Sequence, residues 1–539
     1  MRLFSMLQNA CRIAGLILFI FSQNIQAQNA PAKPAKPNIV IIISDDHAFQ
    51  AVSAYGNKLV KTPNIDRIAQ KGVRLDKAYV TNSICGPSRA VILTGKYSHK
   101  NGFKDNETSK FDHSQDNFAK HLQTGGYQTA WIGKIHLAGK PEGFNFFNLL
   151  PDQGSYYNPE FIGMDGKSIK KEGYVTNLIE DISEEWLDSR DSTKPFCLVV
   201  GHKATHRTWL PDTVDFGRYD SLTFPIPANF YDQYKTRSAA VVQDMSIDKT
   251  MQMAYDLKML SYSSKGEPTV NRMNPAQRAK FDAYYGAIEA DLKSKNLTGK
   301  ALAEWKFQRY MKDYYSTAES LDRNIGRMLD YFEKRELDQN TIVIYMSDQG
   351  FYLGEHGWFD KRFMYEESFR TPLLMQFPGV IKPGTNSSQM VMNLDIAPTL
   401  LDAAGLAIPS DMQGKSMLPV LANKAAKGRE ALYYHYYENG EHAVSPHFGV
   451  STKDYKLIRF YKRVNSWELF DLNKDPSEES NVYGKKGYEK TTLALKQQLT
   501  KLIAEYDDKE AKVILRSEPS AINATHPAPQ LSPFWSAYE

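Results

Sequence analysis

The sequence predicts an α/β fold in which helices enclose a large mixed sheet, followed by a smaller C-terminal α+β subdomain. Three continuous apolar runs, Asn38–Ile43, Phe196–Val200 and Thr341–Met346, are typical of strands buried on both faces of a parallel sheet. Between the second and third runs, apolar residues recur at helical spacing: Ala318, Leu321, Ile325, Met328, Leu329 and Phe332. Strands that alternate with helices indicate a layered α/β domain.

The N-terminal segment, residues 1–28, has the layout of a secretory signal peptide. Arg2 and Arg12 precede an apolar run, Ile13–Phe21, and a cleavage site of small residues follows. The run is shorter than a permanent membrane anchor requires, although a short N-terminal anchor helix is the alternative. We therefore expect an exported protein, periplasmic or secreted, that does not remain in the membrane. An Ala/Pro/Lys-rich linker is expected over residues 29–37.

The composition is that of a soluble globular protein, with 42% hydrophobic and 24% charged residues in a chain of 539. Without the signal peptide the net charge falls from +4 to +2, which gives no electrostatic argument for a nucleic-acid partner. The cysteines fall from three to two, so an exported chain of this length is not a disulfide scaffold. Cys197 lies in a predicted strand, whereas Cys85 lies in a polar turn and is expected to be an exposed, unpaired thiol.

Three segments describe the domain organisation. Residues 38–420 are expected to form the catalytic domain, with a helical insertion over about 219–300, where Lys, Tyr, Met and Ala are abundant. Residues 421–539 are expected to form the C-terminal subdomain. Its predicted strands and helix are Tyr455–Tyr461, Trp467–Asp471 and about Thr491–Tyr506.

Acidic residues directly follow two of the predicted strands. Asp45 and Asp46 follow the first, and Asp348 and Gln349 follow the third. Because ligand sites collect at the carboxyl ends of parallel strands, these two clusters can converge on one site. Carboxylate and amide oxygens suit one Ca²⁺ ion. For the first cluster alone, helix capping is the alternative.

The most specific motif begins at Cys85 and reads Cys-Gly-Pro-Ser-Arg, followed by Leu-Thr-Gly from Leu93. It resembles the maturation signature of the type I sulfatases, in which a sulfatase-maturing enzyme converts the cysteine to formylglycine. The resemblance extends from about Asn38 to about Asn481 and implies the alkaline-phosphatase-like sulfatase fold. It also implies that Arg89, one helical turn beyond Cys85, braces the nucleophile. The alternative is an unmodified thiol in a turn.

Formylglycine explains how a sulfate ester can be attacked although its negative charge repels anionic nucleophiles. The hydrated aldehyde offers two hydroxyl groups on one carbon. One attacks sulfur and expels the alcohol, and loss of the proton from the other regenerates the aldehyde and expels sulfate. This is covalent catalysis, which splits one difficult step into two.

The resemblance also implies a metal site. Asp45, Asp46, Asp348 and Gln349 match the calcium ligands of the family, together with the modified Cys85. The ion would hold a sulfate oxygen and favour ionisation of the attacking hydroxyl. The family often has Asn where this chain has Gln349.

Further matches imply the remaining catalytic residues. Lys134 and His136 lie in a Gly-Lys-x-His segment, where the lysine would hold a sulfate oxygen and the histidine would help to remove the proton that triggers sulfate release. Lys361 matches the second lysine of the family. His206 would protonate the leaving oxygen as a general acid, although Thr205 replaces the usual proline before it. Each residue alone is more often a surface charge, and their order along the chain carries the prediction.

The segment Ser347–Ser368 resembles the bacterial mucin-desulfating and N-acetylglucosamine-6-sulfatase branch. This resemblance implies a sulfated glycan substrate, with 6-O-sulfated N-acetylglucosamine in heparin/heparan-type or mucin glycans. Candidate sugar-binding residues combine aromatic neighbours with polar groups, and packing at the domain junction is the alternative. They are Asp360, Arg370, His435, Glu438, His442 and His447.

Two other functions remain open at this point. A formylglycine-dependent phosphonate or phosphodiester hydrolase would share the fold and a charged tetrahedral substrate. A non-catalytic sulfated-glycan-binding protein would fit if Cys85 stays unmodified.

Overall fold

The computed structural model describes residues 36–263, 270–422 and 426–516. The chain divides into two units, Met1–Lys36 and Pro37–Glu539, and all described residues except Lys36 belong to the second. The predicted signal peptide and most of the predicted linker lie outside the described residues. Within the three described ranges, we find no helix that is both long and apolar enough to cross a membrane.

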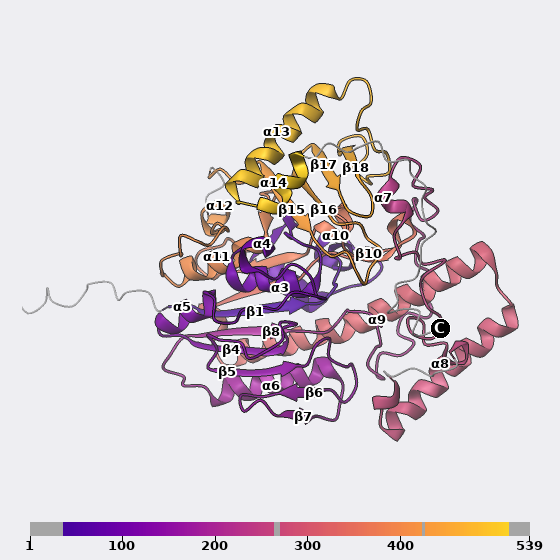
Figure 1. Cartoon of the computed structure of the whole chain (residues 1–539). Coiled ribbons are helices and arrows are strands. Elements are labelled where there is room, and N and C mark those ends of the chain that lie inside the picture. Colours follow the sequence, from indigo (N-terminus) through magenta and orange to yellow (C-terminus); the bar gives the residue numbers. More distant parts are fainter. Residues whose placement is uncertain (1–35, 264–269, 423–425, 517–539) are drawn as a thin grey trace, which may run out of the picture. The chain divides into compact units, whose positions relative to one another are not determined.

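A mixed sheet of ten strands forms the centre of this unit, in the order β13-β2-β12-β9-β1-β8-β4-β5-β6-β7 (Figure 1). The middle strands β9 to β5 in this order run parallel, whereas antiparallel pairs join β12 to β9 and β5 to β6. The bounds are β1 Asn38–Ser44, β2 Val73–Leu75, β4 Gln128–Lys134, β5 Phe146–Leu150, β6 Glu160–Ile162, β7 Ser168–Lys170, β8 Phe196–Gly201, β9 Thr341–Ser347, β12 Leu373–Gln376 and β13 Thr385–Ser387. The predicted fold class and its three strands are confirmed.

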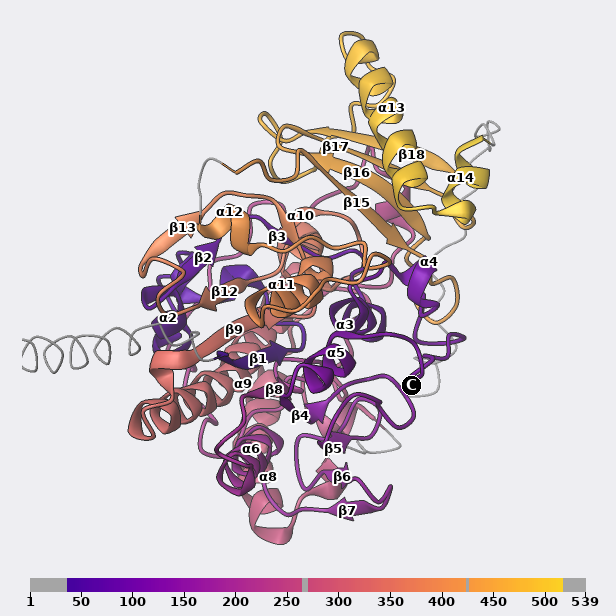
Figure 2. The ribbon, with the colours of Figure 1, turned by 90° about the vertical axis from the view of Figure 1, so that its left-hand side faces the viewer.

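Helices cover both faces of the sheet (Figure 2). On β1, Val40 and Ile42 pack into the core with α2 (Pro63–Gln70), α6 (Val175–Ser189) and α9 (Gly299–Lys334). The alternate residues Ile39, Ile41 and Ile43 pack with α3 (Cys85–Thr94), α5 (Phe118–Thr124) and α11 (Ile396–Ala403). Side chains of a strand alternate between faces, so a run that is apolar at every position requires a cover on each side.

Removing side-chain volume from β1 is expected to destabilise the whole unit. Ile41 is fully buried, and Ile41→Ala should lower the free energy of unfolding by about 2–5 kcal/mol because it leaves a cavity in the close-packed core. Chemical denaturation measures this change. Leu59→Ala is the control, because the Leu59 side chain is 48% exposed and its loss should change stability little. An equal loss in both variants would contradict the assigned burial.

Strand register brings four chain segments to one end of the sheet. Ser44 pairs with Ser347, Ile43 pairs with Gly201, and Gly201 pairs with Gly133. The polar residues that follow β1, β9 and β8 therefore start at the same level, beside the last residue of β4. The predicted convergence at the carboxyl ends of the strands is confirmed.

A four-stranded antiparallel sheet follows in the chain: β15 (Ala431–Tyr436), β16 (His447–Thr452), β17 (Tyr455–Phe460) and β18 (Ser466–Asp471). Helix α13 (Glu489–Glu505) packs on this sheet and α14 (Lys509–Arg516) follows it. These elements confirm the small α+β subdomain. Its core is continuous with Ile84 and Val91 around α3, so it packs directly behind the motif that contains Cys85.

The remaining elements are short, except for one helix. Within the predicted insertion over 219–300, long helical structure is confined to α8, Pro275–Lys295, in the described residues. The stretch before α8 is mostly irregular, in part because Pro225 and Pro227 disfavour helix at and before their positions. The other elements are β3 Ala78–Tyr79, α4 Ser98–Asn101, α7 Ser238–Val241, β10 Tyr352–Leu353, β11 Phe359–Asp360, α10 Glu366–Phe369, β14 Val391–Met392 and α12 Leu418–Ala422.

Candidate active site

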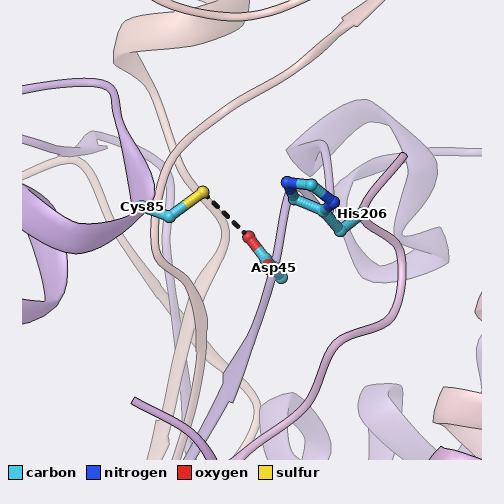
Figure 3. A group of neighbouring side chains, drawn as sticks. All are labelled: Asp45, Cys85 and His206. Atoms are coloured by element: carbon cyan, nitrogen blue, oxygen red, sulfur yellow. Dashed lines mark hydrogen bonds between the residues drawn. The ribbon is translucent and has the colours of Figure 1, made fainter. Parts of the chain in front are cut away.

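Cys85 is the first residue of α3 and points toward the ends of β1 and β9. Its Sγ donates to Asp45 Oδ1 at 3.2 Å and lies 3.3 Å from Lys361 Nζ and 3.6 Å from Gln349 Nε2. Figure 3 shows Asp45 between Cys85 and His206, which comes from the loop after β8. The expectation of an exposed thiol is wrong, since Cys85 is only 1% exposed. The polar turn that suggested exposure is covered by the converging loops.

Three buried carboxylates surround this position. Asp45, Asp46 and Asp348 each offer an oxygen within 4.8 Å of the others, and none is more than 1% exposed. Burial raises the pKa of Asp46 to about 6, and burial with the charge of Asp45 raises the pKa of Asp348 to about 7. Burial acts on Asp45 in the same direction, but Lys134 and the other nearby cations hold its pKa well below the usual range. The three acids thus repel one another in a site shielded from water.

Three cations balance these acids. Lys134 pairs with Asp45, Lys361 Nζ lies 2.6 and 2.7 Å from the two oxygens of Asp46, and Arg89 Nε lies 2.9 Å from Asp348 Oδ2. All of these groups are buried. The six charges cancel formally. Buried charges are stable only when they are paired. Removing any one of the six would therefore leave its partner as an unpaired charge in the protein interior.

The oxygen set fits a hard divalent cation. Gln349 Nε2 donates to Asp46 Oδ1 at 2.5 Å, while Gln349 Oε1 is buried and has no hydrogen-bond partner in the described chain. An orphaned carbonyl oxygen next to three carboxylates supplies the donors that Ca²⁺ or Mg²⁺ prefers. The predicted ligands Asp45, Asp46, Asp348 and Gln349 are therefore brought together by the fold.

The predicted histidines lie on either side of the carboxylates. His206 Nδ1 donates to the carbonyl of Arg207 at 2.7 Å, which leaves Nε2 directed toward Asp46, 3.9 Å from Oδ2. Burial, followed by Lys134, lowers the pKa of His206. His136 Nε2 lies 3.2 Å from Gln153 Nε2, and burial lowers the pKa of His136 to about 4. Both imidazoles are therefore largely neutral before an anion binds.

The backbone at this end of the sheet is unusual in two places. Asp46 and His136 have φ of 64° and 55°, in the left-handed region that residues other than glycine rarely adopt. Gly133, the first residue of the Gly-Lys-x-His segment that ends at His136, has φ of 89°, and a Cβ there would lie 2.1 Å from Gly201 O. The glycine is needed because β4 and β8 approach closely just before Lys134.

Three of the predicted sugar-binding residues lie near Lys361. Asp360 pairs with Arg362 at 2.7 Å, and His442 Nδ1 lies 2.7 Å from Glu438 Oε1. The charges of Arg362 and His442 both lower the pKa of Asp360, although burial opposes them. Asp360, Glu438 and His442, with Arg362, therefore form a polar group next to the buried charged cluster.

The other three candidates do not join this group. His435 is 1% exposed and its two ring nitrogens contact Asp508 and Tyr461. His447 is fully buried between the carbonyl of Ser445 and the amide of Met364. These contacts favour packing at the domain junction, the alternative to sugar binding, for both residues. The Arg370 guanidinium stacks 4.0 Å above the Phe49 ring.

Sequence reasoning missed two residues of the site. Gln153 accepts from Lys134 Nζ through its side chain, and its carbonyl accepts from Lys203 Nζ at 3.1 Å. Lys203 stands three residues before His206 and could have been noticed in that segment. Gln153 follows β5, a strand that the sequence did not predict, so no signal pointed to it.

The sulfatase family matches residues 37–406 of this chain. A second family, described as the C-terminal part of N-sulphoglucosamine sulphohydrolase, matches residues 354–505. The chain is 48% identical over 491 residues to an N-acetylglucosamine-6-O-sulfatase of Bacteroides thetaiotaomicron, and the match covers 88% of each. It is 28% identical to arylsulfatase K of Mus musculus, covering 87% of this chain and 79% of that protein.

Solved structures agree with these matches. One, described as a complex with its substrate D-glucosamine-2-N,6-O-disulfate, superposes with a TM-score of 0.86 at 46% identity and covers 90% of this chain and all of that one. A phosphonate monoester hydrolase of Agrobacterium radiobacter superposes with a TM-score of 0.65 at 19% identity, covering 87% and 96%, which shows a shared fold alone. The family match spans more than half of the chain and coincides with the buried cluster around Cys85. The chain therefore belongs to the sulfatase family and is a sulfuric ester hydrolase.

Proposed function

We propose that this sulfatase removes the 6-O-sulfate of N-acetylglucosamine, or of its N-sulfated counterpart, in heparin/heparan-type or mucin glycans. The observation that carries the reaction is the placement of Cys85 Sγ between Asp45 and Lys361 in a buried, charge-balanced cluster. The relative that is 48% identical is named for this activity, and the solved neighbour is described with a disulfated glucosamine. Sulfatases generally use formylglycine and a divalent metal, and we propose Ca²⁺ at Asp45, Asp46, Asp348 and Gln349.

Position 85 is built to hold an oxygen nucleophile. The Sγ atom of Cys85 occupies the position that a hydroxyl of hydrated formylglycine would take in the mature protein, and that group would supply attack on sulfur and later release of sulfate. Lys361 Nζ, 3.3 Å away, is placed to stabilise negative charge on that oxygen, and Arg89 fixes Asp348 behind it. A bound divalent cation would add two positive charges to a neutral cluster, which favours an anionic ester over a neutral one.

The side chains around Cys85 divide the remaining tasks. Lys134 pairs with Asp45 and Lys361 with Asp46, and each lysine can donate to a sulfate oxygen. His206 directs Nε2 into the site, where an anionic substrate would favour its protonation and let it donate a proton to the leaving sugar oxygen. His136, held by Gln153, is the candidate for removing the proton that precedes sulfate release.

His206→Gln should affect esters with poor leaving groups most. A sugar alkoxide needs a proton as it departs, so kcat for the sugar sulfate should fall by about 100-fold or more. A 4-nitrophenyl ester leaves as a stabilised phenolate and should lose much less. Steady-state kinetics on both esters checks this, with His121→Gln on the protein surface as the control. Equal losses on both esters would contradict the role of a general acid.

The proposed substrate can be tested by comparing sugars that carry the sulfate at different ring positions. The polar group of Asp360, Arg362, Glu438 and His442 beside Lys361 can receive the hydroxyl and amide groups of one sugar ring. A panel of glucosamine and galactosamine monosaccharides, sulfated at the 2-, 3-, 4- or 6-position, should give the highest kcat/KM for 6-O-sulfated N-acetylglucosamine. Preference for a 2-O- or 4-O-sulfate would contradict the proposal.

A formylglycine-dependent phosphonate or phosphodiester hydrolase is the second candidate, because that fold is shared. Matched aryl sulfate and aryl phosphonate esters separate the two, and sulfate turnover should be much the faster. We further propose that the chain is exported and that a sulfatase-maturing enzyme modifies Cys85. Cell fractionation with N-terminal sequencing of the mature protein tests the export, and cleavage near residue 28 is the expected result.

A further inference from the structure

Lys203 is a buried lysine at the edge of the active site. It follows β8 by two residues and is only 5% exposed. Its Nζ donates to the main-chain carbonyl of Gln153 at 3.1 Å and lies 5.0 Å from the centre of the Tyr156 ring. Within the described chain, no carboxylate oxygen comes within 4.0 Å of this ammonium group. Lys203 thus differs from its two neighbouring lysines.

The difference is one of charge compensation. Lys134 is paired with Asp45 and Lys361 with Asp46, whereas Lys203 has one carbonyl for its three N–H donors. A buried ammonium without an acid is costly, since it has lost water and gained little in return. Burial and the charge of Lys134 accordingly lower the pKa of Lys203 to about 7. An anion bound beside Lys203 would remove this penalty.

The position of Lys203 indicates where such an anion would lie. Lys134 Nζ contacts the side-chain oxygen of Gln153 and Lys203 Nζ contacts its main-chain oxygen, so the two ammonium groups meet at one residue. Lys134 also pairs with Asp45, so the contacts through Gln153 link Lys203 to the buried charged residues around Cys85. The charge of Lys203 also contributes to lowering the pKa of His206, the expected proton donor.

We propose that Lys203 binds the sulfate group that is transferred, as a third ammonium donor beside Lys134 and Lys361. This assignment rests on the proposed function only in that a sulfate ester reacts at position 85. Lys203 donates hydrogen bonds to sulfate oxygens and adds a positive charge that the carboxylates of the site do not cancel. Lys203 makes these contacts both with the substrate and with the product sulfate, so it increases the affinity of the site for both.

Inhibition by inorganic sulfate provides the test. Lys203→Met removes the charge and keeps most of the length of the unbranched side chain. It should raise the inhibition constant of inorganic sulfate, measured against a 4-nitrophenyl sulfate substrate, by about tenfold or more. Lys203→Arg should recover part of the affinity. The melting temperature of Lys203→Met should be unchanged or higher, because an uncompensated buried charge is lost.

Lys306→Met is the matched control. Lys306 is also a buried lysine, 6% exposed, whose Nζ donates to main-chain carbonyls, of Asp248 and Met251. It belongs to α9 and not to the site, so its replacement should leave the inhibition constant of sulfate unchanged.

Two outcomes would overturn the proposal. One is an unchanged inhibition constant in Lys203→Met. The other is a defect seen only with a disulfated sugar, which would assign Lys203 to a second anionic substituent. Neither inorganic sulfate nor the aryl ester contains a sugar. A different glycan preference would therefore contradict the proposed substrate, but it would not affect the interpretation of the sulfate inhibition constants. If aryl turnover is too slow, calorimetry with inorganic sulfate replaces it, and equal affinities for wild type and Lys203→Met would overturn the assignment.

Discussion

Cys85→Ala is expected to abolish sulfate-ester turnover while the protein still folds and binds its substrate. Alanine removes the precursor of the nucleophile but keeps a small side chain at the first residue of α3, where the buried thiol contacts the polar groups of Asp45, Gln349 and Lys361. Loss of a covalent nucleophile typically costs about 10⁴-fold or more in kcat, since only positioning and electrostatic effects remain. Steady-state kinetics on a 6-O-sulfated sugar measures the loss, and calorimetry with the same sugar measures retained binding. Turnover within tenfold of wild type would contradict the nucleophile assignment.

Cys197→Ala is the matched control for this prediction. Cys197 is the other buried cysteine in the described chain, near the start of β8 and so at the opposite end of the strands from the carboxylates, and its loss should cost some stability and no activity. Mass spectrometry of the peptide containing Cys85 adds an independent observation. Replacement of the sulfur by an oxo group is expected after expression with a maturing enzyme. An intact thiol in an active preparation would refute the proposed chemistry, and an intact thiol in an inactive one would favour a non-catalytic binding protein.

Asp348→Asn should produce the second largest loss, through the metal site. Asparagine keeps the shape of Asp348 but removes one of three negative charges and leaves Arg89 without its partner. Even residues that only support a metal ligand contribute about 10–100-fold in metal affinity, so a direct ligand should cost at least about 100-fold. Calorimetry with Ca²⁺ measures affinity, and a chelator should inactivate the wild-type protein until Ca²⁺ is returned.

Glu180→Gln is the control for the charge change. Glu180 is a buried carboxyl group on α6 whose oxygens have no hydrogen-bond partner in the described chain, and burial raises its pKa well above the usual value. Because Glu180 lies on α6 and outside the acidic cluster, and glutamine keeps its shape, Glu180→Gln should leave Ca²⁺ affinity and activity unchanged. If the chelator has no effect and Asp348→Asn binds Ca²⁺ as wild type does, the acidic cluster is not the metal site.

The catalytic core was predictable because its residues follow strands. Asp45 and Asp348 come directly after apolar runs whose parallel pairing is set by their hydrophobic pattern, and a parallel register places such residues side by side. The motif at Cys85 then located the third segment. The structure confirms the strands and brings the predicted metal and catalytic residues together, with His136 linked to the others through Gln153.

Residues that depend on loop packing were not predictable in the same way. His435 lies in β15, where aromatic and polar residues mix, and this pattern suggested a sugar-binding surface. In the structure β15 is covered on both faces, so its polar groups pair inside the subdomain. Gln153 shows the converse: a glutamine in a loop after an unrecognised strand carries no sequence signal, and only the tertiary fold places it between two lysines.

The packing of the C-terminal subdomain behind α3 limits when Cys85 is accessible to another enzyme. Ser83 N donates to Tyr434 Oη at 3.1 Å, and His435 N donates to Thr81 O at 3.0 Å, so the segment leading into Cys85 is fastened by residues that emerge from the ribosome some 350 positions later. In the folded chain Cys85 is buried, so its side chain is not accessible to another enzyme. The proposed conversion of this residue would therefore have to take place before these bonds form, because a chain that folded first would keep a thiol that the maturing enzyme could not reach.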